Sequence, residues 1–286
     1  MVIRSCRSVL SLTTRFCLPY EGMTTLDYLS SGSAVVLHNS NGSSLDIVTC
    51  KHVACPWMFP KYFSATWEWL QYVNENHVQH SLQLLSINDA NLRPAVLLEL
   101  PLAPQVHTHK SRDLALLTLK DSTALESWRT VEQKFKLQPL TLQQTPCESG
   151  DAVVFSGHRH HNCIDKKSDN YHTCTTVSGR FVGRSSSGQE FAWSQELLEE
   201  GMCGGAVIGK VTKECVGVVE GIVPIAEQGD EKPLICDNAA HAASQLRQSL
   251  AGHVAFIPAS DVRQFIESPD GLLLTGIELP PHFCEA

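Results

Sequence analysis

Three short segments of this chain carry residue types that could act together in nucleophilic catalysis. Segment 201–205 (GMCGG) places the thiol of Cys203 in a glycine-rich turn, His52 directly follows a strand-like apolar run, and Asp113 directly precedes another. A cysteine attacks as its thiolate, which is scarce at neutral pH, so a histidine that takes its proton would activate it. An acid beside that histidine would orient the ring and stabilise its charged form.

The elements that must position these residues are predicted to be short strands. Segment 33–38 (SAVVLH) is apolar and β-branched, 39–44 (NSNGSS) is typical of a hairpin turn, and 45–49 (LDIVT) is the returning strand that delivers His52. Similar runs predict strands at 82–87, 95–100, 114–119, 151–156, 175–182, 190–193, 205–208 and 216–223. A helix with Ser260 as its N-cap is expected near the end. This pattern indicates a barrel or a sandwich.

Bulk composition excludes several classes of protein. Of 286 residues, 43% are hydrophobic and 18% charged, which predicts a packed core rather than disorder. The net charge of −8 disfavours nucleic acid as a partner. No stretch approaches the roughly 18 consecutive apolar residues that a membrane-spanning helix needs. The 11 cysteines are scattered and odd in number, which favours reduced thiols in an intracellular compartment over a secreted disulfide framework.

The order of the three segments is histidine, aspartate, nucleophile, as in chymotrypsin. The segments resemble the TxxHV, DLALL and GxSGGxV motifs of the chymotrypsin clan, in particular of its Deg/HtrA branch. Further stretches similar to that branch are 31–36 (SGSAVV), 150–157 (GDAVVFSG), 178–182 (SGRFV) and 252–258 (GHVAFIP). The resemblance implies an all-β fold, a chymotrypsin-like double six-stranded β-barrel with a C-terminal helix.

The same resemblance implies a site. His52 would activate Cys203 and Asp113 would orient His52, without a cofactor or a metal. The amides of Gly201 and Cys203 would form an oxyanion hole, in a turn whose φ angles only glycine tolerates well. The pocket candidates flank the turn and are Leu197, Leu198, Val219, Glu220 and Gly221. A polypeptide is the implied substrate, and a homo-oligomer or larger complex is expected because Deg/HtrA enzymes generally form trimers.

Departures from the family leave two functions open. Cysteine replaces the usual serine, the loop between His52 and Asp113 is long, and no PDZ domain is expected after the final helix. A cysteine endopeptidase is favoured because all three triad positions hold competent residues. The alternative is a catalytically inactive trypsin-fold subunit with a structural or binding role in a larger, organellar complex. Taken alone, the turn around Cys203 could simply enclose a buried thiol, and Glu220 could either select a basic residue or face outward.

A second group of potential metal ligands follows the strand at 151–156. Its members are His158, His160, His161, Cys163, His172 and Cys174. Their spacing matches no standard zinc finger, so a polar loop beside the pocket is favoured over a zinc site.

Composition also predicts the domain boundaries. Residues 1–20 carry three arginines, five Ser or Thr and no acid. This composition is typical of a transit peptide and would suit mitochondrial import, although a disordered or strand-forming terminus is the alternative. We expect residues 1–22 as that terminus, 23–125 as an N-terminal barrel with His52 and Asp113, 126–148 as a polar linker, and 149–286 as a C-terminal barrel with Cys203 and the last helix.

Overall fold

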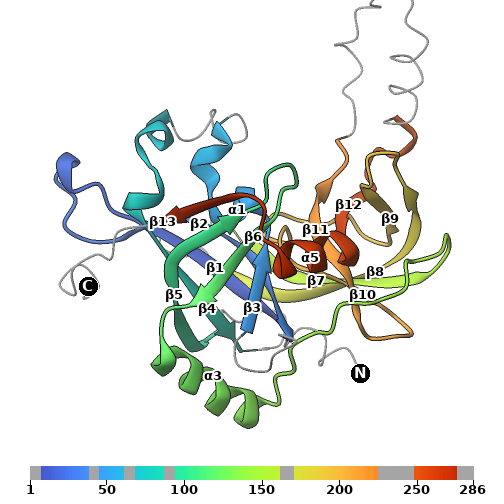
Figure 1. Cartoon of the computed structure of the whole chain (residues 1–286), viewed down its shortest axis with the longest axis horizontal. Helices are drawn as coiled ribbons and strands as arrows, with labels where there is room; N and C mark the ends of the chain where they lie inside the picture. The colour runs from blue at the N-terminus through green and yellow to red at the C-terminus, as the bar shows by residue number, and fades with distance from the viewer. Residues whose placement is uncertain are drawn as a thin grey trace, which may run out of the picture.

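The computed structural model of the chain describes residues 8–38, 45–60, 68–86, 94–161, 171–224 and 248–275. These residues form two closed β-barrels side by side, each made of six antiparallel strands (Figure 1). The double barrel and the C-terminal helix expected from the sequence are therefore confirmed.

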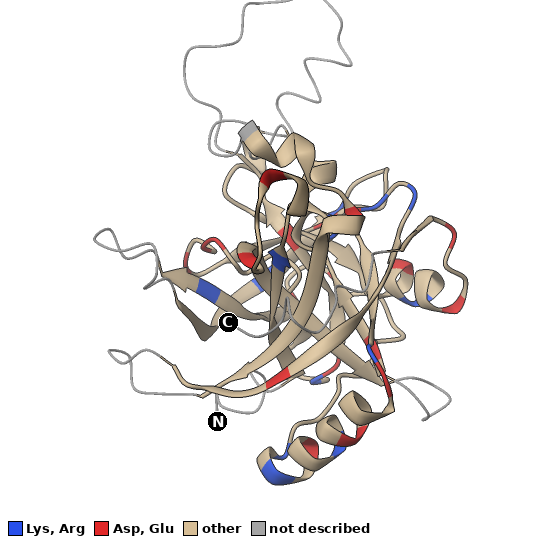
Figure 2. Cartoon of the chain, turned by 90° about the vertical axis from the view of Figure 1, so that its left-hand side faces the viewer, with Lys and Arg blue, Asp and Glu red and all other residues tan. Residues whose placement is uncertain are grey.

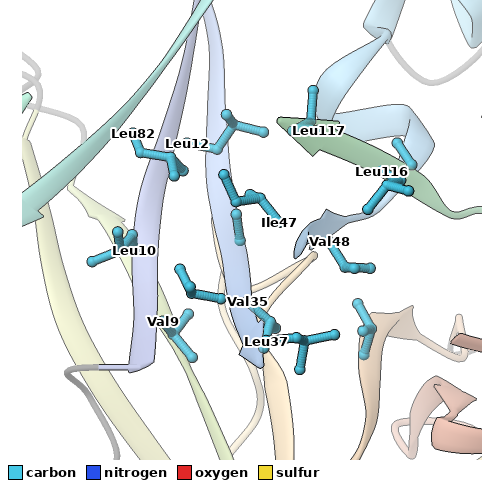
Figure 3. Close-up of a cluster of buried hydrophobic side chains, with 14 of the residues drawn as sticks. Val9, Leu10, Leu12, Val35, Leu37, Ile47, Val48, Leu82, Leu116 and Leu117 are labelled. Atoms are coloured by element: carbon cyan, nitrogen blue, oxygen red, sulfur yellow. The ribbon is translucent and has the colours of Figure 1, made fainter. Parts of the chain in front are cut away.

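The first barrel comprises β1 (Val9–Phe16), β2 (Asp27–His38), β3 (Leu45–Thr49), β4 (Val78–Leu85), β5 (Val96–Thr108) and β6 (Ala115–Leu119). The strands pair in the order β5-β4-β1-β2-β3-β6, and pairing of β6 with β5 closes the ring. Figure 3 shows Leu12, Ile47 and Leu82 close together inside it, whereas Val35 lies on the opposite face of β2, which packs toward the second barrel. Branched apolar side chains pack well on a pleated surface, which is why these runs form strands.

The second barrel comprises β7 (Ala152–His161), β8 (Tyr171–Arg184), β9 (Glu190–Ser194), β10 (Ala206–Gly209), β11 (Cys215–Ile222) and β12 (Val254–Pro258). It closes in the order β10-β11-β12-β9-β8-β7. Phe155, Phe181 and Phe256 are buried in its interior, and the rings of Phe181 and Phe256 meet edge to face at 6.1 Å. The Cys203 turn leads directly into β10, so its C-terminal end is anchored in this packed core.

An apolar interface joins the two barrels. The core of the first barrel continues into the outer face of the second, where Ile208, Val218 and Ile257 are buried, and into helix α5 (Ala259–Glu267) through Val262 and Phe265. Burial of such surface is the main favourable term in association of packed elements. This interface fixes the barrels relative to each other, so residues from both can form one site.

Two helices depart from the sequence-based expectations. Helix α3 (Ser122–Phe135) begins before the expected boundary at residue 125 and continues into the predicted linker, and its N-cap Asp121 accepts a hydrogen bond from the Ala124 amide at 2.9 Å. Only Ala124, Trp128 and Val131 of this helix are buried, and Figure 2 shows acidic and basic residues along its remaining surface. Helix α5 was expected, but it begins after Pro258, so Ser260 lies inside it and is not the N-cap.

The ends of the described chain both join the first barrel. Strand β1 pairs with β2 and β4 and is almost entirely buried, so the barrel begins N-terminal to the expected boundary at residue 23. Strand β13 (Leu272–Thr275) follows α5 and pairs with β5. The remaining described elements are η2 (Pro19–Glu21), α1 (Lys51–Ala54), η3 (Pro56–Met58), η4 (Glu68–Tyr72) and η5 (Glu75–His77). None of the described helices is both long and apolar enough to cross a membrane.

Candidate active site

His52 lies in the short helix α1, where the chain leaves β3 of the first barrel, and Asp113 lies in the loop before β6. Both carboxylate oxygens of Asp113 bind His52. The backbone N–H of His52 donates to Oδ1 at 2.9 Å, and ring Nδ1 lies 2.5 Å from Oδ2. Because a carboxylate can only accept, Nδ1 carries a proton and Nε2 is left for another partner.

That partner is Cys203, which the second barrel contributes. Cys203 lies close enough to the ring that a side-chain hydrogen bond with it contributes to the pKa of His52. With Nδ1 engaged by Asp113, Nε2 is the ring nitrogen left for this contact. Burial alone would lower the pKa of His52, but its hydrogen bonds to Asp113 and Cys203, together with their negative charges, raise it from 6.5 to about 10. These contacts favour the protonated form of the ring.

The turn that carries Cys203 requires glycine at two positions. Gly201 has a φ of +94°, and a Cβ there would lie 2.6 Å from the carbonyl oxygen of His158. Gly204 has a φ of +81°, and a Cβ there would overlap the Ser33 carbonyl and the Thr49 hydroxyl. Glycine alone combines a positive φ with the absence of a Cβ. Both glycines thus let the turn pack tightly between the barrels.

Hydrogen bonds orient four successive carbonyls of this turn. The donors and acceptors are His160 N to Glu200 O at 2.9 Å, Ser33 Oγ to Gly201 O at 2.8 Å, Gly205 N to Met202 O at 3.0 Å, and Ser33 N to Cys203 O at 3.0 Å. In a planar trans peptide the N–H points away from the preceding C=O. Within the described chain, the amides of Gly201 and Cys203 donate to no backbone carbonyl. They are thus free to bind a developing oxyanion.

The expected pocket residues divide into two groups. Leu198 and Val219 are 5% and 1% exposed and pack in the core of the second barrel, whereas Leu197 is 61% exposed and Gly221 borders open space. The backbone of Val219 supports the turn, because its carbonyl accepts the Gly204 amide at 2.8 Å. Leu197, Gly221 and the partly exposed Glu220 are therefore the members that present atoms to solvent.

The side chain of Glu220 lies near the triad. It is hydrogen-bonded to Gln189 and lies within electrostatic range of Asp113, His52 and Arg112. Burial raises the pKa of Glu220, and the charge of Asp113 raises it further. Glu220 therefore places a carboxyl group close to Asp113, and neither of the two sequence-based alternatives for this residue is tested by that position.

Cys50 was not singled out by the sequence, although it lies two residues before His52. It is fully buried and donates through its thiol to the Val219 carbonyl at 3.0 Å. Burial raises the pKa of Cys50 well above its usual range, with the charge of Asp113 adding to the effect. In the described part of the chain, Cys50, His52 and Asp113 form the one group with ligand atoms close enough for a metal ion, within 4.8 Å of one another. The 2.5 Å contact between Nδ1 and Oδ2 leaves no room for an ion between them.

The second group of potential ligands is spread along β7 and β8. Cys163 lies outside the described residues, and the described members bring no three ligand atoms together. His172 instead bridges the barrels, since its Nδ1 lies 3.1 Å from the hydroxyl of Ser11 and its Nε2 lies 2.7 Å from that of Ser31. Burial lowers the pKa of His172 to about 4, so the neutral ring makes these hydrogen bonds.

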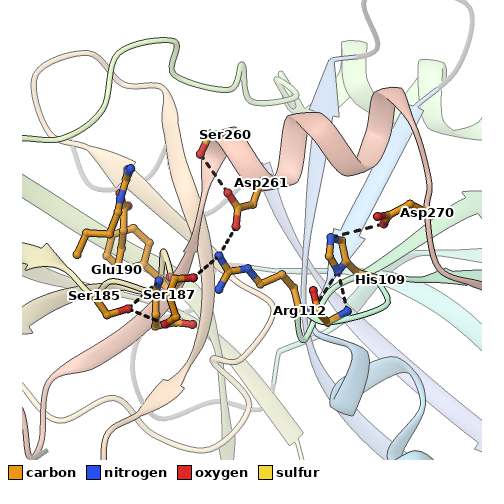
Figure 4. Close-up of polar contacts among 12 residues, drawn as sticks. His109, Arg112, Ser185, Ser187, Glu190, Ser260, Asp261 and Asp270 are labelled. Atoms are coloured by element: carbon orange, nitrogen blue, oxygen red, sulfur yellow. Dashed lines mark hydrogen bonds and ion pairs between the residues drawn. The ribbon is translucent and has the colours of Figure 1, made fainter. Parts of the chain in front are cut away.

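The loop that carries Asp113 is held by residues from both barrels (Figure 4). Arg112 pairs with Asp261 of α5 at 2.7 Å and donates to the Ser187 carbonyl at 3.0 Å. His109 Nδ1 accepts the amides of Ser111 and Arg112 at 3.1 and 2.9 Å. Sequence reasoning missed this network because Arg112 lies far along the chain from Ser187 and Asp261.

Comparison with known proteins concerns the fold. Neither a protein-family model nor a curated protein matches the sequence. The serine endoprotease from Yersinia pestis has a similar structure, with a TM-score of 0.50 and 15% identity over 92% of this chain and 63% of that one. The active form of the Rv3671c protease from M. tuberculosis gives a TM-score of 0.48 and 14% identity, covering 96% of this chain and 85% of that one. The chain thus spans less than two thirds of the Yersinia protein, and what it shares with that protein is the double β-barrel of the trypsin-like serine proteases.

Proposed function

We propose that this chain is a cysteine endopeptidase that hydrolyses peptide bonds through Cys203, His52 and Asp113. The observation that carries the proposal is the arrangement around His52, whose Nδ1 is hydrogen-bonded to Asp113 and whose pKa is raised by its contact with Cys203. The unengaged amides of Gly201 and Cys203 support the same reaction. The similar fold of a serine endoprotease adds to the case.

The proposed reaction begins with the thiolate of Cys203 beside the protonated ring of His52. The thiolate attacks the peptide carbonyl carbon, and the resulting oxyanion accepts hydrogen bonds from the Gly201 and Cys203 amides. His52 then gives its Nε2 proton to the leaving amine as the C–N bond breaks, which leaves a thioester on Cys203. Neutral His52 next takes a proton from water, the hydroxide attacks the thioester, and the acid product leaves as the thiolate and the imidazolium reform. Asp113 holds the ring in position throughout.

Active-site labelling tests this function. A peptidyl chloromethyl ketone should modify Cys203 before the other cysteines, and an unfolded polypeptide such as casein should be cleaved. Cys203→Ala should abolish both activities. Cys147→Ala is the matched control because this half-buried thiol lies outside the site, and burial raises its pKa to about 11. Absence of cleavage, with Cys203 labelled no faster than Cys147, would favour the inactive trypsin-fold subunit instead.

A further inference from the structure

We propose that Ser33 is a positioning residue, which holds the oxyanion-hole turn of the second barrel from strand β2 of the first. This role rests on the proposed function, because it concerns the step in which an oxyanion forms. Ser33 is fully buried, so it cannot contact substrate and acts through the turn.

The polar atoms of Ser33 are all engaged around the turn. Its hydroxyl donates to the Gly201 carbonyl at 2.8 Å and accepts the His158 amide at 2.8 Å, while its own amide donates to the Cys203 carbonyl at 3.0 Å. Its carbonyl accepts the hydroxyl of Thr49 at 2.7 Å. The single hydroxyl proton is committed to Gly201, which gives this contact a fixed direction.

These contacts determine where the oxyanion donors point. Between the Gly201 amide and the Cys203 amide lies one peptide group, which joins Gly201 to Met202. The Ser33 hydroxyl donates a hydrogen bond to the carbonyl of this peptide group. The unit that follows Cys203 is held by the Ser33 amide. Glycine allows a wider range of φ and ψ than other residues, so the backbone at Gly201 is easily rotated. A hydrogen bond from outside the turn is therefore needed to fix the angle between the Gly201 and Cys203 N–H groups.

Ser33 also connects the nucleophile turn to the strand that leads to His52. Thr49 is the last residue of β3, and its hydroxyl binds the Ser33 carbonyl. Gly204 packs against both groups, with no room for a Cβ. The backbone carbonyl of Ser33 therefore helps to set the spacing between Cys203 and His52, and Ser33→Ala keeps this group while it removes the hydroxyl that binds Gly201.

Two chemical probes separate this positioning role from activation of the thiol. Iodoacetamide alkylates a thiolate without forming an oxyanion, whereas p-nitrophenyl acetate acylates it through a tetrahedral oxyanion. For Ser33→Ala we expect alkylation of Cys203 within twofold of the wild-type rate. Acylation should fall by about 100-fold, the cost of a small misplacement at a reacting centre. Rates for the other cysteines are subtracted using Cys203→Ala.

Matched variants control for stability. Thr14→Val removes another buried hydroxyl of the first barrel, which lies 3.0 Å from Nδ1 of His80 and away from the turn, and it should leave both rates unchanged. If Ser33→Ala does not fold, the isosteric pair Ser33→Thr and Ser33→Val gives the same comparison, since only Thr keeps the hydroxyl. Equal acylation by that pair, or a parallel loss of alkylation and acylation in Ser33→Ala, would refute the positioning role. If wild-type Cys203 reacts with neither probe faster than the background, the proposed function itself fails.

Discussion

Arg112 in the first barrel forms a 2.7 Å ion pair with Asp261 at the start of helix α5 in the second. Arg112 lies one residue before Asp113, so the ion pair connects the loop that carries Asp113 to the opposite barrel. Both side chains are largely shielded from solvent, at 21% and 26% exposed. Gly188 leaves the space that the guanidinium needs, because a Cβ there would lie 2.6 Å from its Nη2.

Removing this pair should loosen the Asp113 loop. For Arg112→Met, which keeps the apolar stem, we expect the free energy of unfolding to fall by about 1–2 kcal/mol, through loss of the ion pair and of the hydrogen bond to Ser187. The rate of Cys203 acylation should fall as well, because Asp113 orients His52. Urea denaturation and initial rates measure the two effects. Arg129→Met on the exposed surface of α3 is the control, and equal effects of the two variants would show that Arg112 is only a surface charge.

The raised pKa of His52 predicts how stability depends on pH. Because the folded pKa of about 10 exceeds the ordinary value of 6.5, the folded state favours the protonated ring. The contribution is fully present below pH 6.5 and is lost as the pH rises through 10. Asp113→Asn removes one cause of the raised pKa, so the wild type should be more stable than the variant at pH 6.5, by a margin that shrinks toward pH 10. Urea denaturation at a series of pH values tests this, and a margin independent of pH would contradict it.

Parts of the site that are local in sequence could be predicted. The residues next to His52 and Cys203 show where a strand ends and where a turn needs glycine, and both features follow from composition and φ preference. The roles of Ser33 and Arg112 could not be predicted, because each depends on contacts between barrels that only packing creates. Glu220 illustrates the same limit, since alternation along a strand does not reveal that its side chain reaches the neighbourhood of Asp113.

The fold, like the site, was predictable in some elements and not in others. The β-branched runs predicted most strands, because a half-buried strand selects for them. Helix α3 was missed because only Ala124, Trp128 and Val131 mark its buried face within an otherwise polar segment. Strand β1 was assigned to a terminal segment because its arginine and hydroxyl residues resemble a targeting sequence. In the barrel, however, hydroxyls such as that of Thr14 bond to neighbouring strands.

The position of strand β1 predicts how deletion of N-terminal residues affects stability. Deletion of residues 1–20 would remove β1 and leave the paired edges of β2 and β4 open, together with the apolar surface that Leu10 and Leu12 cover. We expect this variant to lose its cooperative thermal transition, as followed by circular dichroism. Deletion of residues 1–7 keeps every described strand and should melt like the full chain. A cooperative, active product of the longer deletion would instead support removal of this segment as a transit peptide.

Gly201 offers the most direct test of the turn geometry. Gly201→Ala must place a Cβ 2.6 Å from the His158 carbonyl oxygen and hold alanine at a φ of +94°. We expect the free energy of unfolding to fall by about 1–3 kcal/mol, the usual cost of such a conformation. Displacement of the Gly201 amide should also lower the rate of Cys203 acylation by about 100-fold or more.

Gly183→Ala is the matched control, since its Cβ would meet nothing within 4 Å and its φ is ordinary. Its stability should stay within about 0.5 kcal/mol of the wild type. Because His52 and Asp113 do not contact the new methyl group, alkylation by iodoacetamide should persist in Gly201→Ala, and its loss would mean that the turn sets the reactivity of the thiol rather than the binding of the oxyanion.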